Sequence, residues 1–409
     1  MGDGMKLLRM LVGAAFLGSA WCLPARAQER GAVETVRIPG TDFSFEMIFL
    51  PGGRFKMGSP EGEPGRRPDE GPVREVEVRP FWISRHEVSW EIFARWFESH
   101  PEAAADGVTR PSKPYEAPNA GMGTGRHPAI SMRWHGAVQC AEWISRKTGQ
   151  RFRLPTEAEW EYACRAGSDR PAPEPLGDHA WYAENSGGQT HEGGTRKPNA
   201  FGLHDMLGNA WEYALEPYKP PAFGPVLRGG AWNSPAADCR AARRQAVQEE
   251  WYERDPNRPR SIWWFTDAPF VGFRLVRFVD PAGRAEQEAY AGKIEVRGLK
   301  AEPAADAMAR VTGEIRNGGD RTLEEVELTV FYLDEKGKPL FADRKDRATF
   351  TKAYPVLVNS GHPGEQREPL APGACRRFQV EIPQAYDYDV DLDQVGARVT
   401  ALQFARRSP

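Results

Sequence analysis

Apolar and polar residues alternate in short runs from Lys293 to the end of the chain. The apolar positions are Ile294, Val296, Val311, Ile315, Val326, Leu328, Val330, Phe378, Val380, Ile382, Val395, Val399 and Leu402. A period of two is typical of β-strands that bury one face, and several such strands separated by turns predict a sandwich. The glycine-containing stretches 317–320 and 334–338 are expected to form hairpin turns. The pattern therefore predicts a small all-β domain over residues 285–409.

The residues before position 280 show many turns and short apolar runs instead. Two helices are expected, one that includes residues 92–97 and one that includes residues 157–163. Pro155 and Thr156 precede acidic residues at the second, which is a helix-start signal. Trp160 and Ala163 are expected to face the core. The loop 58–72 is rich in proline and glycine, so we expect it to be irregular and its charges to be hydrated.

Tryptophan content marks a boundary between these two parts. The chain has 409 residues, which is too long for one typical core, and 13 tryptophans, twelve of which lie between Trp82 and Trp264. None follows Trp264, and residues 280–284 have the composition of a linker. We therefore predict one domain over residues 34–279 and a second over residues 285–409.

The first 27 residues have the pattern of a secretory signal peptide. Lys6 and Arg9 precede an apolar run over residues 10–23, and Ala25-Arg26-Ala27 has the small-x-small form of a cleavage site. The mature protein is therefore expected in the periplasm or outside the cell. No later apolar run approaches eighteen residues, so no membrane span is predicted. Trp21 makes Cys22 a poor lipidation site.

Charge and cysteine content exclude two classes of protein. With 54 basic and 57 acidic residues interspersed, the chain has no electrostatic footprint for nucleic acid. Four cysteines follow the signal peptide, a low density that implies no disulfide framework. Cys140 and Cys164 lie in helical patterns over residues 137–144 and 158–164, where a small buried side chain is expected.

Residues 201–213, FGLHDMLGNAWEY, combine two carboxylates with a glycine-asparagine turn. Asp205 and Glu212 are seven positions apart, and a bend at Gly208 and Asn209 would let backbone carbonyls face the same point. Calcium prefers a cage of six to eight oxygens of this kind. The alternative is a plain turn that leads into a short strand, and spacing alone favours that alternative.

Five runs together resemble the sulfatase-modifying factor family, whose founding activity is formylglycine generation. They are residues 47–59 (MIFLPGGRFKMGS), 153–163 (RLPTEAEWEYA), 201–213, 227–233 (LRGGAWN) and 271–276 (VGFRLV). The resemblance implies an α+β fold with little regular secondary structure, related to C-type lectins and stabilised by Ca²⁺. The run 311–317 resembles bacterial immunoglobulin-like sandwiches.

The resemblance also implies calcium ligands. The family's better-kept site matches the side chains of Asp205 and Glu212 and the carbonyls of Gly208 and Ala210. Asn185 and Ser186 are candidates for the start of a second site, which is otherwise not assigned.

The family's oxidase activity implies two cysteines that bind Cu(I), because this soft ion is held by sulfur. Residues 229–243 (GGAWNSPAADCRAAR) contain one cysteine. Counted from the glycines, Ser234 stands where the first thiol is expected and Cys239 where the second is. Counted backward from residues 241–243, the segment is four residues short and neither expected position is a cysteine. Cys239 is thus the candidate catalytic residue, a lone thiol whose pKa Arg240, Arg243 and Arg244 would lower. Copper is not expected, and packing of Cys239 is the alternative.

A binding role competes with catalysis. The stretch 248–268 is rich in aromatic residues and arginines, which can stack on sugars or hold extended peptides. The candidate ligand-binding residues are Trp232, Ser234, Arg243, Trp263 and Trp264, although burial in the core explains the aromatic ones equally well. We therefore expect an exported, calcium-stabilised binding or accessory module for a peptide, protein or glycan. The alternative is a formylglycine-generating oxidoreductase that acts on sulfatase cysteines.

Overall fold

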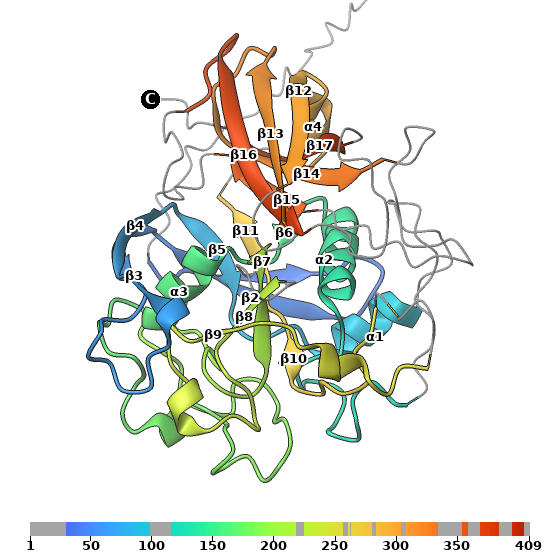
Figure 1. Cartoon of the computed structure of the whole chain (residues 1–409). Helices are drawn as coiled ribbons and strands as arrows, with labels where there is room; N and C mark the ends of the chain where they lie inside the picture. Colours follow the sequence, from blue (N-terminus) through green and yellow to red (C-terminus); the bar gives the residue numbers. More distant parts are fainter. Residues whose placement is uncertain are drawn as a thin grey trace, which may run out of the picture.

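The computed structural model describes residues 30–98, 116–217, 225–256, 261, 263–279, 284–303, 308–333, 354–358, 369–383 and 395–404. Its strands outnumber its helices, and helices and strands alternate without a regular repeat (Figure 1). The fold is thus of the mixed α+β class that the sequence predicts. The expected signal peptide and the turn 334–338 lie outside the described residues.

Three sheets are formed by residues before position 280. The largest has the strand order β1 (Val33–Arg37), β2 (Ser44–Leu50), β5 (Phe81–Ser84), β11 (Val276–Phe278) and β6 (Phe152–Arg153), all antiparallel. A second has the order β10 (Val271–Gly272), β7 (Trp211–Pro217), β8 (Pro225–Arg228) and β9 (Arg244–Gln245), with β10 parallel to β7. The third is a hairpin of β3 (Gly53–Met57) and β4 (Arg74–Val78).

Both predicted helices are confirmed, at α1 (Trp90–Glu98) and α3 (Glu157–Arg165). The hydroxyl of Thr156 accepts a hydrogen bond from the Glu159 backbone at 3.1 Å, and the Glu159 carboxylate accepts one from the Thr156 backbone at 2.8 Å. This reciprocal cap satisfies two N–H groups that the first turn leaves without partners. A further helix, α2 (Trp134–Thr148), contains Cys140 and ends at Gly149, whose φ of 70° is left-handed.

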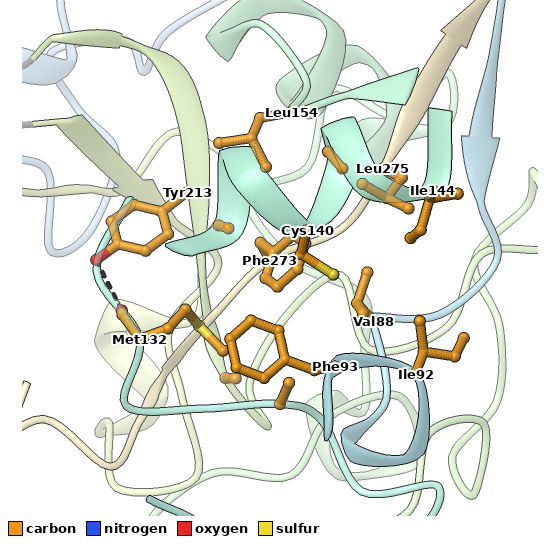
Figure 2. Packing of buried hydrophobic residues seen from close by; sticks show 14 of the residues in the cluster. Val88, Ile92, Phe93, Met132, Cys140, Ile144, Leu154, Tyr213, Phe273 and Leu275 are labelled. Carbon is orange, nitrogen blue, oxygen red and sulfur yellow. Dashed lines mark hydrogen bonds between the residues drawn. The ribbon is translucent and has the colours of Figure 1, made fainter. Parts of the chain in front are cut away.

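The hydrophobic core packs α1 and α2 against the large sheet. Figure 2 shows Phe93 of α1, Cys140 of α2 and Phe273 gathered in this core, with the Tyr213 hydroxyl donating to the Met132 carbonyl at 3.1 Å. A neighbouring cluster contains Trp160 and Ala163, which are fully buried as predicted, together with Cys239. Buried residues from both segments in which functional residues are expected, 201–213 and 229–243, therefore belong to these two clusters.

Six strands lie after position 284 in the described part of the chain. Five of them coincide with the predicted period-two runs, and one was not predicted. They form two antiparallel three-stranded sheets. The orders are β12 (Ile294–Pro303), β13 (Met308–Asn317) and β16 (Cys375–Pro383), and β15 (Tyr354–Val358), β14 (Leu323–Tyr332) and β17 (Val395–Phe404). The unpredicted strand is β15. Together with α4 (Arg284–Ala291), these strands lie at one end of the molecule (Figure 1).

The predicted hairpin at residues 317–320 is wrong. This turn joins β13 to β14, which belong to different sheets. The Asn317 side chain donates to the carbonyls of Arg321 and Leu370, so it ties the turn to a third segment and not to a strand partner. Buried residues of both sheets, among them Val311 and Val326, share one hydrophobic cluster.

None of the helices that the structure describes is long and apolar enough to pass through a lipid bilayer.

Candidate functional site

The predicted cation loop, residues 205–212, is a buried turn that leads into β7. Asp205 and Asn209 have φ angles of 53° and 57°, which side chains with short polar groups tolerate best. At Gly208 a Cβ atom would lie 2.1 Å from the Trp181 carbonyl oxygen, so only glycine fits. The backbone of this loop is thus tightly packed and has an unusual conformation, whereas spacing alone favoured a plain turn.

Four segments distant in sequence hold the backbone N–H groups of this loop. Gly208 donates to the Gly229 carbonyl at 3.0 Å, Asn209 to the Trp181 carbonyl at 2.7 Å, Ala210 to Glu87 Oε1 at 3.1 Å and Trp211 to the Phe270 carbonyl at 2.8 Å. Because a peptide group is planar, a fixed N–H also fixes the direction of the carbonyl bonded to it. The orientations of the Gly208 and Ala210 carbonyls are therefore set by tertiary contacts.

Glu212 belongs to a buried ion pair. Its Oε2 accepts from Arg274 Nε at 2.6 Å and from Trp160 Nε1 at 2.7 Å, and its Oε1 accepts from Arg274 Nη2 at 2.6 Å. The side chains of Glu212 and Arg274 are 1% and 0% exposed. Because an ionised carboxylate has about four lone-pair sites, these contacts leave Glu212 able to accept one more partner.

Asp205 has one oxygen with a partner and one without. Its Oδ2 accepts from the Gly194 backbone at 2.8 Å, whereas its Oδ1 is buried and has no hydrogen-bond partner. Burial raises the pKa of Asp205 to about 6, against the opposing hydrogen bond from Gly194. A buried carboxylate oxygen without a partner is costly in a native protein, and a bound cation would satisfy it.

Glu87 is a buried carboxylate at this loop that the sequence reasoning missed. It lies between β5 and α1, and its oxygens accept from the Ala210 backbone at 3.1 Å and from Asn209 Nδ2 at 2.9 Å. Burial, followed by the charges of Asp205 and Glu212, raises the pKa of Glu87 well above its ordinary value. Its run of sequence carried no local signal, because its partners lie more than 120 residues away.

The charges of this cluster do not balance. When Glu87, Asp205 and Glu212 are ionised, three buried carboxylates lie near the buried positive charge of Arg274, and the charge of Arg196 also acts on Asp205. Buried charge without compensation is strongly unfavourable, and it is relieved either by protonation, which the raised pKa values of Glu87 and Asp205 favour, or by a divalent cation. Among the described residues, no three histidine, cysteine or acidic side chains are grouped closely enough to hold a metal by themselves. A cation here would therefore need backbone carbonyls, as Ca²⁺ commonly uses.

Cys239 is a buried core residue. A Cβ atom on Gly230 would lie 2.8 Å from the Cys239 sulfur, which shows how closely the glycine covers the thiol. Burial, followed by the charges of Asp238 and Glu184, raises the pKa of Cys239 to about 12. The expectation that three neighbouring arginines lower this pKa is therefore wrong.

Each of those arginines is engaged by acidic partners. Arg240 pairs with Glu63 and Glu70, Arg243 with Asp238, and Arg244 with Glu157. The contacts of Arg240 also correct the expectation that charges in the loop 58–72 are hydrated. The side chains of Glu63 and Glu70 are 4% and 0% exposed, because Arg240 anchors this loop to the segment that contains Cys239.

Ser234 closes a turn. Its Oγ accepts a hydrogen bond from the Ala231 backbone at 2.9 Å, and its carbonyl accepts one from Ala183 at 2.9 Å. The hydroxyl at the position of the expected first thiol therefore has a structural partner.

Most of the candidate ligand-binding residues are buried. Trp263 and Trp264 belong to the core cluster around α1, and Arg243 is 1% exposed and lies over the Trp211 ring. Trp232 is partly exposed, and its indole N–H donates to the Pro269 carbonyl at 3.0 Å. In the described part of the stretch 248–268, packing in the core explains the aromatic residues. Arg258 and Arg260 lie outside the described residues.

We predict that native thiol labelling will separate the cysteines. Cys375 is exposed, whereas Cys140 and Cys239 are buried and burial raises the pKa of both thiols. Because the thiolate is the nucleophile, maleimide at pH 7.5 should modify Cys375 within minutes and Cys239 only after denaturation. Peptide mapping by mass spectrometry measures this. Labelling of Cys239 as fast as Cys375 would contradict its burial.

We predict that Glu70→Gln will destabilise the protein by about 1.5–3 kcal/mol near neutral pH, as loss of a charged hydrogen bond does. Burial opposes ionisation of Glu70, but hydrogen bonds from Arg240 and Ser59 outweigh it and lower the pKa. The stabilisation is thus present above the unfolded pKa of 4.5 and is lost as the pH falls through the lower folded value. Denaturant melts of the two proteins should converge in acid. Glu75→Gln, in an exposed pair, is the control.

Comparison with known proteins places these features in a family. Residues 41–279 match the sulfatase-modifying factor enzyme 1-like domain, named FGE-sulfatase. The serine/threonine-protein kinase pkn1 of Chlamydia pneumoniae is 34% identical over 229 residues, which are 49% of this chain and 35% of that protein. The chain thus spans about a third of the length of that relative.

Two relatives are covered more completely. The inactive C-alpha-formylglycine-generating enzyme 2 of Mus musculus is 30% identical over 46% of this chain and 74% of that protein. The formylglycine-generating enzyme of Thermomonospora curvata is 30% identical over 42% of this chain and 71% of that protein. Among solved structures, PvdO from Pseudomonas aeruginosa is 30% identical, with a TM-score of 0.48 over 62% of this chain and all of that one. The family match covers more than half of the chain, which therefore belongs to the sulfatase-modifying factor family.

Proposed function

We propose that this chain is an exported, calcium-stabilised member of the family that binds a peptide, protein or glycan and does not oxidise cysteine. One observation carries the proposal. The two positions expected to supply thiols hold Ser234, whose hydroxyl closes a turn, and Cys239, whose sulfur lies buried beneath Gly230.

The chemistry of Cu(I) supports the loss of oxidation. This ion is held by thiolates and not by a hydroxyl. Cys164 is packed against the same hydrophobic cluster as Cys239, but burial raises the pKa of both thiols to about 12. Both thiols are therefore neutral and buried in the absence of metal, so copper would have to displace their protons. A mouse relative that is named inactive lies at an identity similar to that of the enzymes.

The charge of the loop 205–212 supports calcium. Asp205 and Glu212 would bind Ca²⁺ together with the carbonyls of Gly208 and Ala210. The ion would satisfy Asp205 Oδ1 and offset the excess of buried negative charge around Arg274. Its role in this proposal is to stabilise the fold, since none of these groups is exposed at a surface.

Export and an immunoglobulin-like second domain are supported by the sequence pattern and by the packing of the two three-stranded sheets. The N-terminal 27 residues support export, and the shared hydrophobic cluster of the two three-stranded sheets supports an immunoglobulin-like sandwich behind the family domain. A relation to C-type lectins is part of the same proposal. Trp232, partly exposed and held by the Pro269 carbonyl, is the remaining candidate for ligand contact.

The second candidate function is formylglycine generation. It is favoured by 30% identity to the Thermomonospora curvata enzyme over 71% of that protein. It requires two thiols that hold Cu(I) together, and the segment 229–243 supplies one of them, Cys239.

We predict that the purified protein will leave a sulfatase-derived cysteine peptide unchanged in the presence of Cu(I), O₂ and a thiol reductant. Mass spectrometry of the peptide measures conversion, and an active formylglycine-generating enzyme is the positive control. Conversion by this chain that is lost in Cys239→Ser would establish the oxidase instead. Conversion that persists in that variant would place the chemistry at other residues.

We predict that removing Ca²⁺ with a chelator will lower the melting temperature, because a ligand at 100 times its Kd stabilises a protein by about 2.7 kcal/mol. Asp205→Asn should abolish this response, since it removes the charge and keeps an oxygen for Gly194. Glu212 is a poorer choice, because its loss removes the carboxylate that pairs with the buried charge of Arg274. Asp178→Asn, in an exposed pair, is the matched control. An unchanged melting temperature in chelator would remove calcium from the proposal.

A further inference from the structure

We propose that Glu87 is the positioning residue of the cation loop. Glu87 is not one of the predicted calcium ligands. It holds the Asn209–Ala210 peptide group, which lies between the two peptide groups that contain the predicted ligand carbonyls of Gly208 and Ala210. The inference rests on the proposed calcium site and adds the residue that shapes it.

The geometry follows from three consecutive peptide groups. The first contains the Gly208 carbonyl and the Asn209 N–H, the second the Asn209 carbonyl and the Ala210 N–H, and the third the Ala210 carbonyl and the Trp211 N–H. Backbone carbonyls of Trp181 and Phe270 hold the outer two groups, and Glu87 Oε1 holds the middle one. The middle group is joined to its neighbours through the φ and ψ angles of Asn209 and Ala210. By holding that group, Glu87 restricts the angles that set the two ligand carbonyls relative to each other.

Glu87 also holds the side chain of the residue at the bend. Its Oε2 accepts from Asn209 Nδ2 at 2.9 Å, and Asn209 Oδ1 in turn accepts from the His191 backbone at 2.9 Å. Asn209 has a φ of 57°, a left-handed conformation that asparagine tolerates better than most residues and that local hydrogen bonds of its side chain support. One carboxylate thus fixes the backbone and the side chain at the centre of the loop.

The same contacts extend to the loop 191–194. Asn209 binds both the N–H and the carbonyl of His191, and Asp205 Oδ2 accepts from Gly194. Gly194 has no room for a side chain, because a Cβ atom there would lie 2.6 Å from the His86 ring. Residues 191–194 are therefore hydrogen-bonded to two side chains of the cation loop, Asn209 and the predicted ligand Asp205. Binding of a cation to Asp205 should order this second loop as well.

The orphaned oxygen of Asp205 shows that the cluster lacks a group. Asp205 is 2% exposed, and its Oδ1 has no partner among the residues described. Glu87 makes no hydrogen bond to that oxygen, and its own oxygens accept from Asn209 and Ala210. A cation that binds Asp205 would therefore meet a loop whose central peptide group is already held by Glu87.

The test is isothermal titration of the full-length mature chain with Ca²⁺ after chelation. Three variants are compared with the wild type. Glu87→Gln removes the charge and one acceptor, and Glu87→Asp keeps the charge but is too short to hold both Asn209 and Ala210. Glu157→Gln, in a buried ion pair with Arg228, is the matched control. Loss of a partner that orients metal ligands typically weakens affinity 10–100-fold, and we expect this in both Glu87 variants.

Each outcome has a distinct meaning. Glu157→Gln should lower stability and leave the calcium Kd within about twofold of wild type, and the Glu87 variants should also lose calcium-induced protection of amides 191–194 from hydrogen exchange. Wild-type affinity in both Glu87 variants would overturn the proposal and leave the calcium site intact. Wild-type affinity in Glu87→Asp beside weakened Glu87→Gln would also overturn it, since charge alone would then account for the effect. Absence of calcium binding by the wild type would instead refute the proposed site, and this inference with it.

Discussion

The buried ion pair between Glu212 and Arg274 is the interaction on which the rest of the family domain depends. Glu212 lies on β7 of the four-stranded sheet, and Arg274 lies between β10 and β11, which belong to different sheets. Arg274 also donates to the carbonyls of Ser84 and His204. A single guanidinium therefore joins two sheets and the cation loop. Removing one partner of a buried pair typically costs about 3–5 kcal/mol, because the other charge remains in the interior.

Arginines perform a similar task elsewhere in the domain. Arg228 bonds to Glu157 and Glu161 of α3 and to the carbonyls of Ala241 and Ala242. Long irregular segments contain many carbonyls without a partner in a helix or sheet, and a buried guanidinium has five donors to offer them. The carboxylates on α3 then balance the charge. This explains how a domain with short strands keeps a buried interior that is rich in charge.

The sequence predicted features whose cause is local. The start of α3 was predictable because Thr156 and Glu159 cap each other within one turn, and five strands after position 284 were predictable from alternation alone. The turn at residues 317–320 was not, because a hairpin and a connection between sheets use the same turn residues. Glu87 and the partners of Arg240 were also beyond reach, since each contact joins segments more than 100 residues apart. The cation loop was predictable only in part. Its composition indicated oxygen ligands, but the contacts that orient them come from segments distant in sequence.

The closeness of Gly230 to the Cys239 sulfur bears on how easily the family's oxidation chemistry could return. Changing Ser234 to cysteine would restore the number of thiols in the segment. It would also remove the hydroxyl that closes the turn at Ala231, and the sulfur of Cys239 would still lie beneath the backbone, in its neutral form. Recovering a copper site would require the segment to be repacked before any second thiol became useful. If the chain lacks the oxidase activity, as we propose, one substitution would therefore not supply it, because the shape of the core keeps the Cys239 sulfur covered.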